Sequence, residues 1–128
     1  MNDSIFTKIV QGDIPAHKVY EDDLTLAFLS IMPIVRGHVL VIPKKQVEYL
    51  WDLDDETYLA VMKTTKKVAL HIKKILQTER VGVKVIGEEV PHAHIHLIPF
   101  NTMQEYNAEQ KLASPGELDE MAAKLRFE

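Results

Sequence analysis

Three histidines alternate with apolar residues in the segment His92-Ala93-His94-Ile95-His96-Leu97-Ile98, and Pro99 follows it. Successive side chains of a β-strand point to opposite faces, so this alternation predicts a strand with three imidazoles on one face and apolar side chains on the other. An apolar face must pack against a core, and proline ends strand pairing because it lacks a backbone N–H. The segment therefore predicts a sheet with one face in the core and a histidine row on the opposite face.

Four further segments have the apolar, β-branched composition of strands and are bounded by turn residues. They are residues 17–20, 24–29, 38–42 and 81–86. These segments follow one another without regular helical crossovers, which favours an α+β fold over a doubly wound sheet. With residues 92–98 they predict a mainly antiparallel sheet of about five strands.

One long helix and two short ones are expected around this sheet. From Asp54 to about Gln77, apolar residues recur at the i, i+3, i+4 spacing of a long amphipathic helix. A short helix is expected near residues 5–10, with Asp3 or Ser4 as its N-cap. The capping-box signature Ser114-Pro115-Gly116-Glu117 predicts another near the end of the chain.

The length and composition indicate one folded domain over residues 1–128, with a core at about 4–100 and a tail at 101–128 that carries the last short helix. The chain has 128 residues, of which 46% are hydrophobic and 27% charged, as is usual for a globular protein. The formal net charge of -4 argues against binding a nucleic-acid polymer, which relies on Lys and Arg. Any nucleotide bound here is therefore expected to be small.

The cysteine count and the first residues bear on location. The chain has no cysteine, so it forms no disulfide and suits a reducing compartment. Its first residues lack the basic start and apolar run of a signal peptide, and no apolar stretch approaches the length of about 18 residues that spans a membrane. We expect a cytoplasmic protein without membrane insertion.

The histidine spacing suits phosphate chemistry. Neighbouring members of the row lie roughly 7 Å apart along a strand, at a rise of about 3.4 Å per residue, so they reach different atoms of one ligand. An imidazole ordinarily titrates near pH 6.5, within reach of neutral pH. One histidine can therefore act as a neutral nucleophile while the next is a cation beside phosphate oxygens.

Two other interpretations fit the same spacing. His-x-His pairs also bind zinc, and His38 after Gly37 would supply a further ligand. A row of polar side chains can also face water without any function. The spacing alone leaves open phosphate chemistry, an inert polar face, and a zinc site at His38, His92, His94 and His96.

The histidine row, with apolar residues between and after its members, resembles the motif of the histidine triad (HIT) superfamily. The resemblance covers roughly residues 4–100. The segments that carry it, besides the row, are Ser4-Ile5-Phe6-Thr7-Lys8-Ile9 with Ile14-Pro15-Ala16, Ala27-Phe28-Leu29, and Gly37-His38-Val39-Leu40-Val41-Ile42-Pro43-Lys44. Within the superfamily, the chain is most similar to the histidine triad nucleotide-binding, or protein kinase C inhibitor-like, branch.

That resemblance implies an α+β HIT-like fold, a homodimer, and a purine nucleotide or nucleotide conjugate as ligand. The implied reaction is hydrolysis or nucleotidyl transfer at the α-phosphate of nucleoside phosphoramidates or related compounds, dinucleotide polyphosphates among them. It needs no cofactor. The nucleotide is first transferred to a histidine, and water then releases the nucleoside monophosphate.

The resemblance also implies roles for single residues. His94 is the nucleophile that becomes nucleotidylated, and His92 orients it partly through its backbone carbonyl. His96 and His38 line the phosphate and leaving-group side. The apolar slot for the base is formed by Ile5, Phe6, Ile9, Phe28 and Ile31.

Two further substrate-binding positions depart from the family pattern. Ser30 stands where the family has an Asp that binds the ribose hydroxyls, and a hydroxyl lacks the charge and paired oxygens of a carboxylate. Glu89 stands three residues before His92, where the family has Ser or Thr, and a carboxylate there repels phosphate unless it is protonated or turned away. A salt bridge from Glu89 to Arg36 or Lys84 is the alternative interpretation. Both departures keep open a second reading, a nucleotide-binding regulatory module with little turnover.

Overall fold

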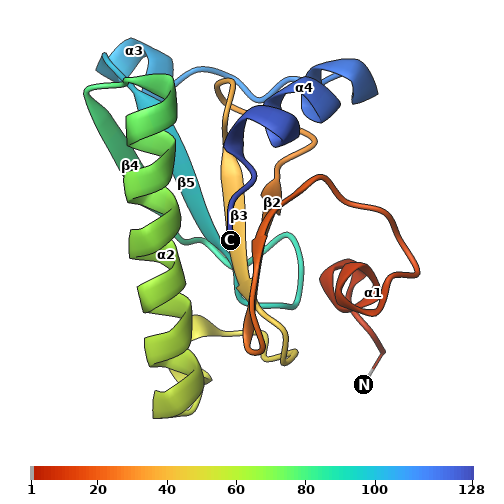
Figure 1. The fold of residues 1–128 in the computed structure, drawn as a ribbon. Helices are drawn as coiled ribbons and strands as arrows, with labels where there is room; N and C mark the ends of the chain where they lie inside the picture. The colour runs from red at the N-terminus through yellow and green to blue at the C-terminus, as the bar shows by residue number, and fades with distance from the viewer. Residues whose placement is uncertain (1) are drawn as a thin grey trace.

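Five strands form one antiparallel sheet in the computed structural model, which describes residues 2–128 (Figure 1). The strand order is β1-β2-β3-β5-β4, and all four neighbouring pairs are antiparallel. The strands are Lys18–Glu21 (β1), Thr25–Leu29 (β2), Val39–Pro43 (β3), Arg80–Lys84 (β4) and Ile95–Phe100 (β5). The predicted α+β fold with a five-stranded sheet is confirmed.

Helices cover both faces of the sheet. The long helix α2 (Asp55–Leu76) runs along one face and α1 (Ile5–Gln11) lies on the other side (Figure 1). The remaining helical segments are the 3₁₀ turn η1 (Leu50–Asp52), α3 (Met103–Tyr106) and α4 (Pro115–Leu125). The sequence did not predict η1 or α3. None of the helices in residues 2–128 combines the length and apolar character required to cross a bilayer.

Side-chain caps fix where the predicted helices begin. Ser4 accepts the backbone N–H of Thr7 at the start of α1, so Ser4 and not Asp3 is the N-cap. Asp54 caps α2 through the N–H of Thr57, and Ser114 caps α4. Each cap satisfies a backbone donor that has no partner within the helix.

The sheet separates two hydrophobic clusters. All five residues of β2 and all five of β3 are buried, and they alternate between the two faces. The larger cluster joins the sheet to α2 and α4, and it includes Ala93, Ile95 and Leu97. The smaller cluster joins Phe6 and Ile9 of α1 to side chains of β2 and β3. The histidine row therefore lies on the α1 side of the sheet, because it alternates with residues of the larger cluster.

The last strand starts later than predicted. β5 begins at Ile95 rather than at His92, and its pairing with β3 stops at Val41 opposite Ile95. The preceding residues bond elsewhere, because Ala93 N–H donates to the Val47 carbonyl and the His92 ring bonds to the Pro43 carbonyl. The prediction that residues 92–94 belong to the strand was wrong, although the alternation of faces persists through them.

The tail packs on the domain. Ala113 N–H donates to the Ile31 carbonyl over 3.0 Å, and Phe127 N–H donates to the Val19 carbonyl over 3.0 Å. The Phe127 ring also stacks against the rings of Tyr20 and His71. These bonds hold α4 against the β1 side of the sheet and against the loop that follows β2.

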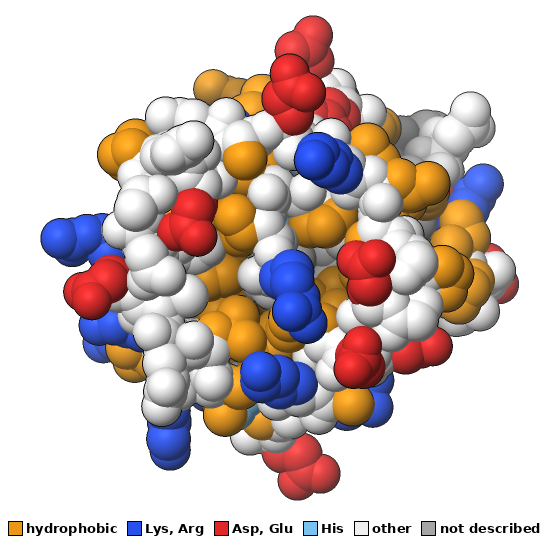
Figure 2. All heavy atoms as spheres, turned by 90° about the horizontal axis from the view of Figure 1, so that it is seen from above, with side chains coloured by type: hydrophobic (Ala, Val, Ile, Leu, Met, Phe, Trp, Pro, Cys, Tyr) orange, Lys and Arg blue, Asp and Glu red, His pale blue; other side chains and the backbone are white. Residues whose placement is uncertain are grey.

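Figure 2 views the end of the molecule at which α3 and α4 lie. Basic side chains cross the middle of this face, hydrophobic side chains lie between and beneath them, and acidic side chains lie to either side. Proteins that bind nucleic-acid polymers present a basic patch or stripe. This face instead mixes both charges.

Candidate active site

A cavity of about 600 Å³ lies between α1, the sheet and the tail. Its volume is in the range of small-molecule sites. His94 and His96 line it, whereas His92 and His38 lie behind its wall. The predicted substrate-binding residues all line it: Ile5, Phe6, Ile9, Phe28, Ser30, Ile31 and Glu89.

One end of the cavity is an apolar slot beside the histidines. The Phe6 ring meets the Phe28 ring edge to face at 5.4 Å between centroids, and meets the His94 ring in the same way at 5.1 Å. Phe6, Ile9 and Phe28 are buried, while Ile5 and Ile31 are half exposed at 48% and 58%. The slot therefore has a rigid aromatic floor and exposed aliphatic edges, which suits a flat ring.

His94 presents one unprotonated ring nitrogen. Its Nδ1 lies 2.8 Å from the backbone carbonyl oxygen of His92. A carbonyl oxygen only accepts, so Nδ1 carries the proton and donates. In neutral His94 the lone pair is then on Nε2, which has no hydrogen-bond partner among residues 2–128. This is the protonation state that a nucleophilic imidazole requires.

His92 is buried and held by both ring nitrogens. Its Nε2 donates to the Pro43 carbonyl over 2.7 Å, and its Nδ1 accepts from the Ser4 hydroxyl over 2.8 Å. Burial lowers the pKa of His92, the Pro43 carbonyl opposes this shift, and the charge of His94 adds to it. His92 is therefore a neutral support whose carbonyl orients His94.

His38 fixes the proton of His96. Ile34 N–H donates to His38 Nδ1 over 3.0 Å, so the proton of neutral His38 is on Nε2. That Nε2 lies 2.9 Å from His96 Nδ1, which accepts it. Neutral His96 then carries its own proton on Nε2. His96 thus offers the cavity a donor beside the lone pair of His94.

Burial keeps this histidine pair neutral. It lowers the pKa of His38 to about 4, with further lowering from the charges of His96 and Lys84. It also lowers the pKa of His96 to about 4, together with the charges of His94 and Lys84. Gly37 sets the approach to His38 with φ of 89°, and a Cβ there would lie 2.6 Å from the Leu76 side chain. Only glycine meets both conditions without strain.

The comparison with known proteins identifies the family. A model of the HIT domain matches residues 11–103. The chain belongs to the HIT family.

Similar HIT proteins include one named for its activity and two of known structure. The chain is 40% identical over 100 residues to a Schizosaccharomyces pombe protein named adenosine 5′-monophosphoramidase, a match covering 74% of this chain and 72% of that protein. A crystal structure of a Hit-like protein involved in cell-cycle regulation from Bartonella henselae has a TM-score of 0.88 and 38% identity, and the match covers 98% of this chain and 96% of the other. A Zn-bound histidine triad family protein from Mycobacterium smegmatis has a TM-score of 0.81 and 29% identity, with coverage of 95% and 89%. These relatives support a nucleotide hydrolase at the level of the HIT family.

The two residues that depart from the HIT pattern are placed differently. Ser30 is buried, and its hydroxyl accepts the N–H of Met32 over 3.2 Å, so it closes a local turn. Glu89 lines the cavity, and within residues 2–128 it forms no ion pair with Arg36 or Lys84. The pairing considered for Glu89 is therefore not formed.

Sequence reasoning missed two groups of residues at the HIT site. The first supports His92: Gln46 Oε1 accepts from Ser4 N–H and from the Thr7 hydroxyl, which ties α1 to the loop after β3. The prediction of an N-cap at Asp3 or Ser4 was the only local signal for this group. The second group lines the cavity and consists of His17, Gln110, Asp119 and Arg126. The last three belong to the tail, where no motif singled them out.

The histidines of this HIT protein offer few lone pairs to a metal. Across residues 2–128, no three His, Cys, Asp or Glu side chains form a group arranged to hold an ion. In the neutral tautomers, His92, His38 and His96 use their lone pairs as hydrogen-bond acceptors. The donor set therefore does not fit a zinc site without rearrangement.

Proposed function

We propose that this HIT protein hydrolyses nucleoside phosphoramidates, or related nucleotide conjugates, at the α-phosphate through a covalent nucleotidyl-His94. The observation that carries the proposal is the 2.8 Å bond from His94 Nδ1 to the His92 carbonyl, which leaves a lone pair on Nε2 at the cavity. The similarity to an adenosine 5′-monophosphoramidase supports an adenosine nucleotide as the substrate.

The reaction divides into two displacements at phosphorus. In the first, His94 Nε2 forms a bond to the α-phosphorus, the bond from phosphorus to the leaving amine breaks, and the amine takes up a proton. In the second, a water oxygen forms the new bond, the bond to His94 breaks, and a proton is released. The proton consumed in the first step is returned in the second, so the net reaction is hydrolysis.

The neighbouring groups suit this sequence. The Nε2 proton of His96 donates to a phosphoryl oxygen as charge develops on it, which is a positioned electrostatic stabilisation. The slot of Phe6, Ile9 and Phe28 holds the purine ring, and the half-exposed Ile5 and Ile31 close over it. We propose that no cofactor is needed, because the lone pair and the donor are both supplied by imidazoles.

A zinc site is the competing proposal, and a bound zinc in the Mycobacterium smegmatis relative motivates it. Such a site would give about one zinc per chain on metal analysis of protein purified without chelator. We expect far less than that, because among the four candidate ligands, all within residues 2–128, His94 alone has a lone pair without a hydrogen-bond partner. Stoichiometric zinc would replace the nucleophile mechanism.

We further propose that the protein works as a homodimer in the cytoplasm. β4 is an outer strand of the sheet, and Val83, Val85 and Ile86 along and after it are half exposed. Open strand edges with apolar side chains pair with another chain unless they are blocked. A second copy of this chain is the proposed partner, and sedimentation of wild type against Val83→Lys tests it.

The decisive experiment is intact-protein mass spectrometry after brief mixing with adenosine phosphoramidate, combined with an assay for released AMP. Wild type should form an adenylyl adduct and release AMP, and His94→Ala should do neither. His71→Gln is the matched control, because it removes an imidazole that lies outside the cavity. If nucleotide binds but neither adduct nor AMP appears, the protein is a binding module and the hydrolase proposal fails.

A further inference from the structure

We propose that Asp119, held in place by His17, binds the ribose hydroxyls of the nucleotide. The tail helix α4 would then supply a specificity determinant of the cavity. This inference rests on the proposed function in one respect, since it takes the ligand to be a nucleotide. It concerns recognition of the sugar and is independent of the covalent step at His94.

The Asp119 carboxylate is held at one oxygen and open at the other. Oδ1 lies 3.1 Å from His17 Nδ1, and the side chains are 74% exposed for Asp119 and 25% exposed for His17. Within residues 2–128, Asp119 makes no other side-chain hydrogen bond or ion pair. Both residues line the cavity that contains His94. The pair therefore presents a carboxylate that is oriented by one contact and whose second oxygen is free to accept hydrogen bonds.

Backbone bonds place this pair beside the end of β2. Leu29 N–H donates to the His17 carbonyl over 3.0 Å, and the next residue, Ser30, donates its N–H to the His38 carbonyl over 2.9 Å. Ser30 therefore lies between His17, which is bonded to its neighbour Leu29, and His38, the hydrogen-bond partner of His96. The bond from Ala113 N–H to the Ile31 carbonyl ties the tail to this loop, directly before α4 begins.

Ser30 itself is poorly suited to bind a diol. Its hydroxyl oxygen already accepts Met32 N–H, which leaves one proton and one lone pair, and its side chain is buried. Two vicinal hydroxyls are best matched by a carboxylate, which accepts through two oxygens and makes the stronger, charge-assisted bonds. Dinucleotide-binding Rossmann folds, for example, place an Asp or Glu on a ribose hydroxyl. In this cavity the carboxylate must come from another residue.

Two carboxylates, those of Glu89 and Asp119, line the cavity, and their positions indicate which of them can reach the ribose. Glu89 precedes Val90, which packs against the smaller hydrophobic cluster, and it lies three residues before His92. It is therefore near the histidines, where the proposed function places the phosphate. A carboxylate repels phosphate there. Asp119 lies at the other side, on α4 next to His17 and the loop after β2. Asp119 is therefore the group available to the sugar between base and phosphate.

The test is calorimetric binding of AMP, 2′-deoxy-AMP and 3′-deoxy-AMP to full-length wild type, Asp119→Asn and Glu120→Gln. Wild type should bind AMP at least about tenfold more tightly than either deoxy analogue, as expected for a hydrogen bond to a charged group. Asp119→Asn should lose most of this discrimination. Glu120→Gln, an exposed neighbour on the same helix, should keep it. If Asp119 had only a structural role, its replacement would not change the ratio of the affinities for AMP and the deoxy analogues.

Two results overturn the inference: a wild type that does not prefer AMP over both analogues, or the same preference in Asp119→Asn as in wild type. This test and the test of the proposed function can succeed or fail independently of each other. If Asp119 controls discrimination but no adduct forms on His94, the sugar contact stands and the hydrolase fails. If the adduct forms but Asp119→Asn keeps the wild-type preference for AMP, the hydrolase proposal stands and this inference fails.

Discussion

The Nε2 atom of His38 lies 2.9 Å from the Nδ1 atom of His96, and this bond decides which nitrogen of His96 carries its proton. His38 does not line the cavity, so its effect on a ligand is exerted through His96. The backbone N–H of Ile34 begins the relay, because it occupies Nδ1 of His38. The backbone N–H of Ile34 thus sets, through the ring of His38, which nitrogen of His96 carries the proton.

Replacing His38 with Ala should release the proton of His96 to either nitrogen. We expect kcat to fall roughly 10- to 100-fold, the scale seen when a group that orients a ligating or reacting side chain is removed. KM should change less, since the base slot is untouched. Steady-state kinetics with adenosine phosphoramidate measure this, and ¹⁵N shifts of the imidazoles report the tautomer. An unchanged kcat with His96 still protonated on Nε2 would contradict the relay.

The buried histidines should make stability depend on pH. Unfolded histidine has a pKa of about 6.5, whereas burial lowers the pKa of His38 and of His96 to about 4. Between these values the unfolded chain binds more protons than the folded one, so the free energy of unfolding falls as pH falls. Urea unfolding at pH 7, 5.5 and 4.5 should show this decline, and His38→Gln should show a shallower one. Equal stability at pH 7 and 4.5 in wild type would refute the assignment.

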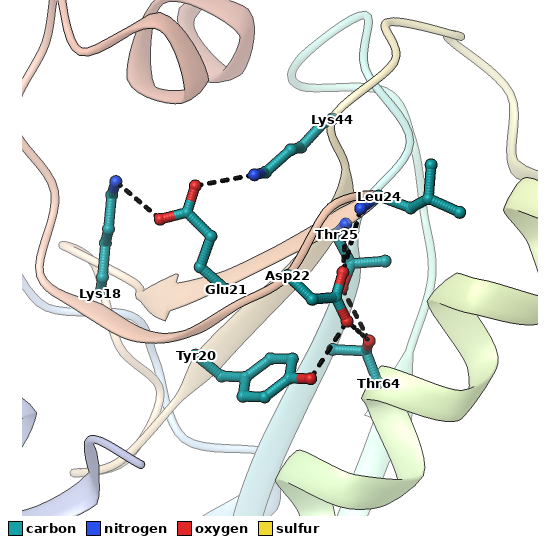
Figure 3. Close-up of polar contacts among 8 residues, drawn as sticks. All are labelled: Lys18, Tyr20, Glu21, Asp22, Leu24, Thr25, Lys44 and Thr64. Atoms are coloured by element: carbon teal, nitrogen blue, oxygen red, sulfur yellow. Dashed lines mark hydrogen bonds and ion pairs between the residues drawn. The ribbon is translucent and has the colours of Figure 1, made fainter. Parts of the chain in front are cut away.

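The carboxylate of Asp22 organises the β1–β2 hairpin (Figure 3). Its Oδ1 accepts the backbone N–H of Leu24 and both the N–H and the hydroxyl of Thr25, while Oδ2 accepts the Tyr20 hydroxyl over 3.1 Å. Thr64 of α2 also approaches Oδ2, which links the hairpin to the helix. These bonds, led by those of Thr25, lower the pKa of Asp22 against the effect of its burial.

Asp22→Asn should therefore destabilise the fold by about 1–3 kcal/mol, because an amide offers one acceptor oxygen and leaves donors unpaired. Asp23→Asn is the control, since Asp23 is the exposed neighbour in the same turn. Urea unfolding measures both variants at neutral pH. The cavity lies on the other side of the sheet, so AMP binding by folded Asp22→Asn should be unchanged. Equal stability of the two variants would show that the network contributes little.

The local patterns of the chain predicted its elements better than its long-range contacts. Alternation placed Ala93 and Ile95 in the core and the histidines on the other face, because side-chain period is a local property of an extended chain. Alternation did not reveal that β5 begins at Ile95, since that boundary depends on the bond from Ala93 to Val47.

The cavity was likewise predicted in part. Its apolar slot was predicted from the part of the resemblance to the HIT family that residues in the first third of the chain carry. Asp119 reaches the cavity because the tail bonds both to the loop after β2 and to β1, and no spacing within residues 101–128 encodes those contacts. The contact of Ser4 with His92 was likewise predicted only in part. Asp3 or Ser4 was expected to cap α1, whereas the bond from Ser4 to His92 spans 88 positions of sequence.

Ser4 has two tasks, and a matched variant separates them. Its hydroxyl oxygen accepts Thr7 N–H as the cap of α1, and the same hydroxyl donates to His92 Nδ1. Ser4→Ala should cost about 1 kcal/mol for the lost cap. It should also lower kcat, because His92 Nδ1 loses the nearer of its two hydroxyl neighbours, and the other, Thr7, donates its proton to Gln46.

Ser114→Ala is the control, since Ser114 caps α4 through Glu117 N–H and has no bond to the histidines. Both variants should lose similar stability in urea unfolding. Only Ser4→Ala should lower kcat at 25 °C, where both remain folded, and Ser4→Thr should restore it by returning a hydroxyl to the same atom position. If Ser4→Ala and Ser114→Ala have the same kcat, His92 keeps its orientation without Ser4. The Pro43 carbonyl, with the Thr7 hydroxyl 3.3 Å from His92 Nδ1, would then be sufficient to hold the ring.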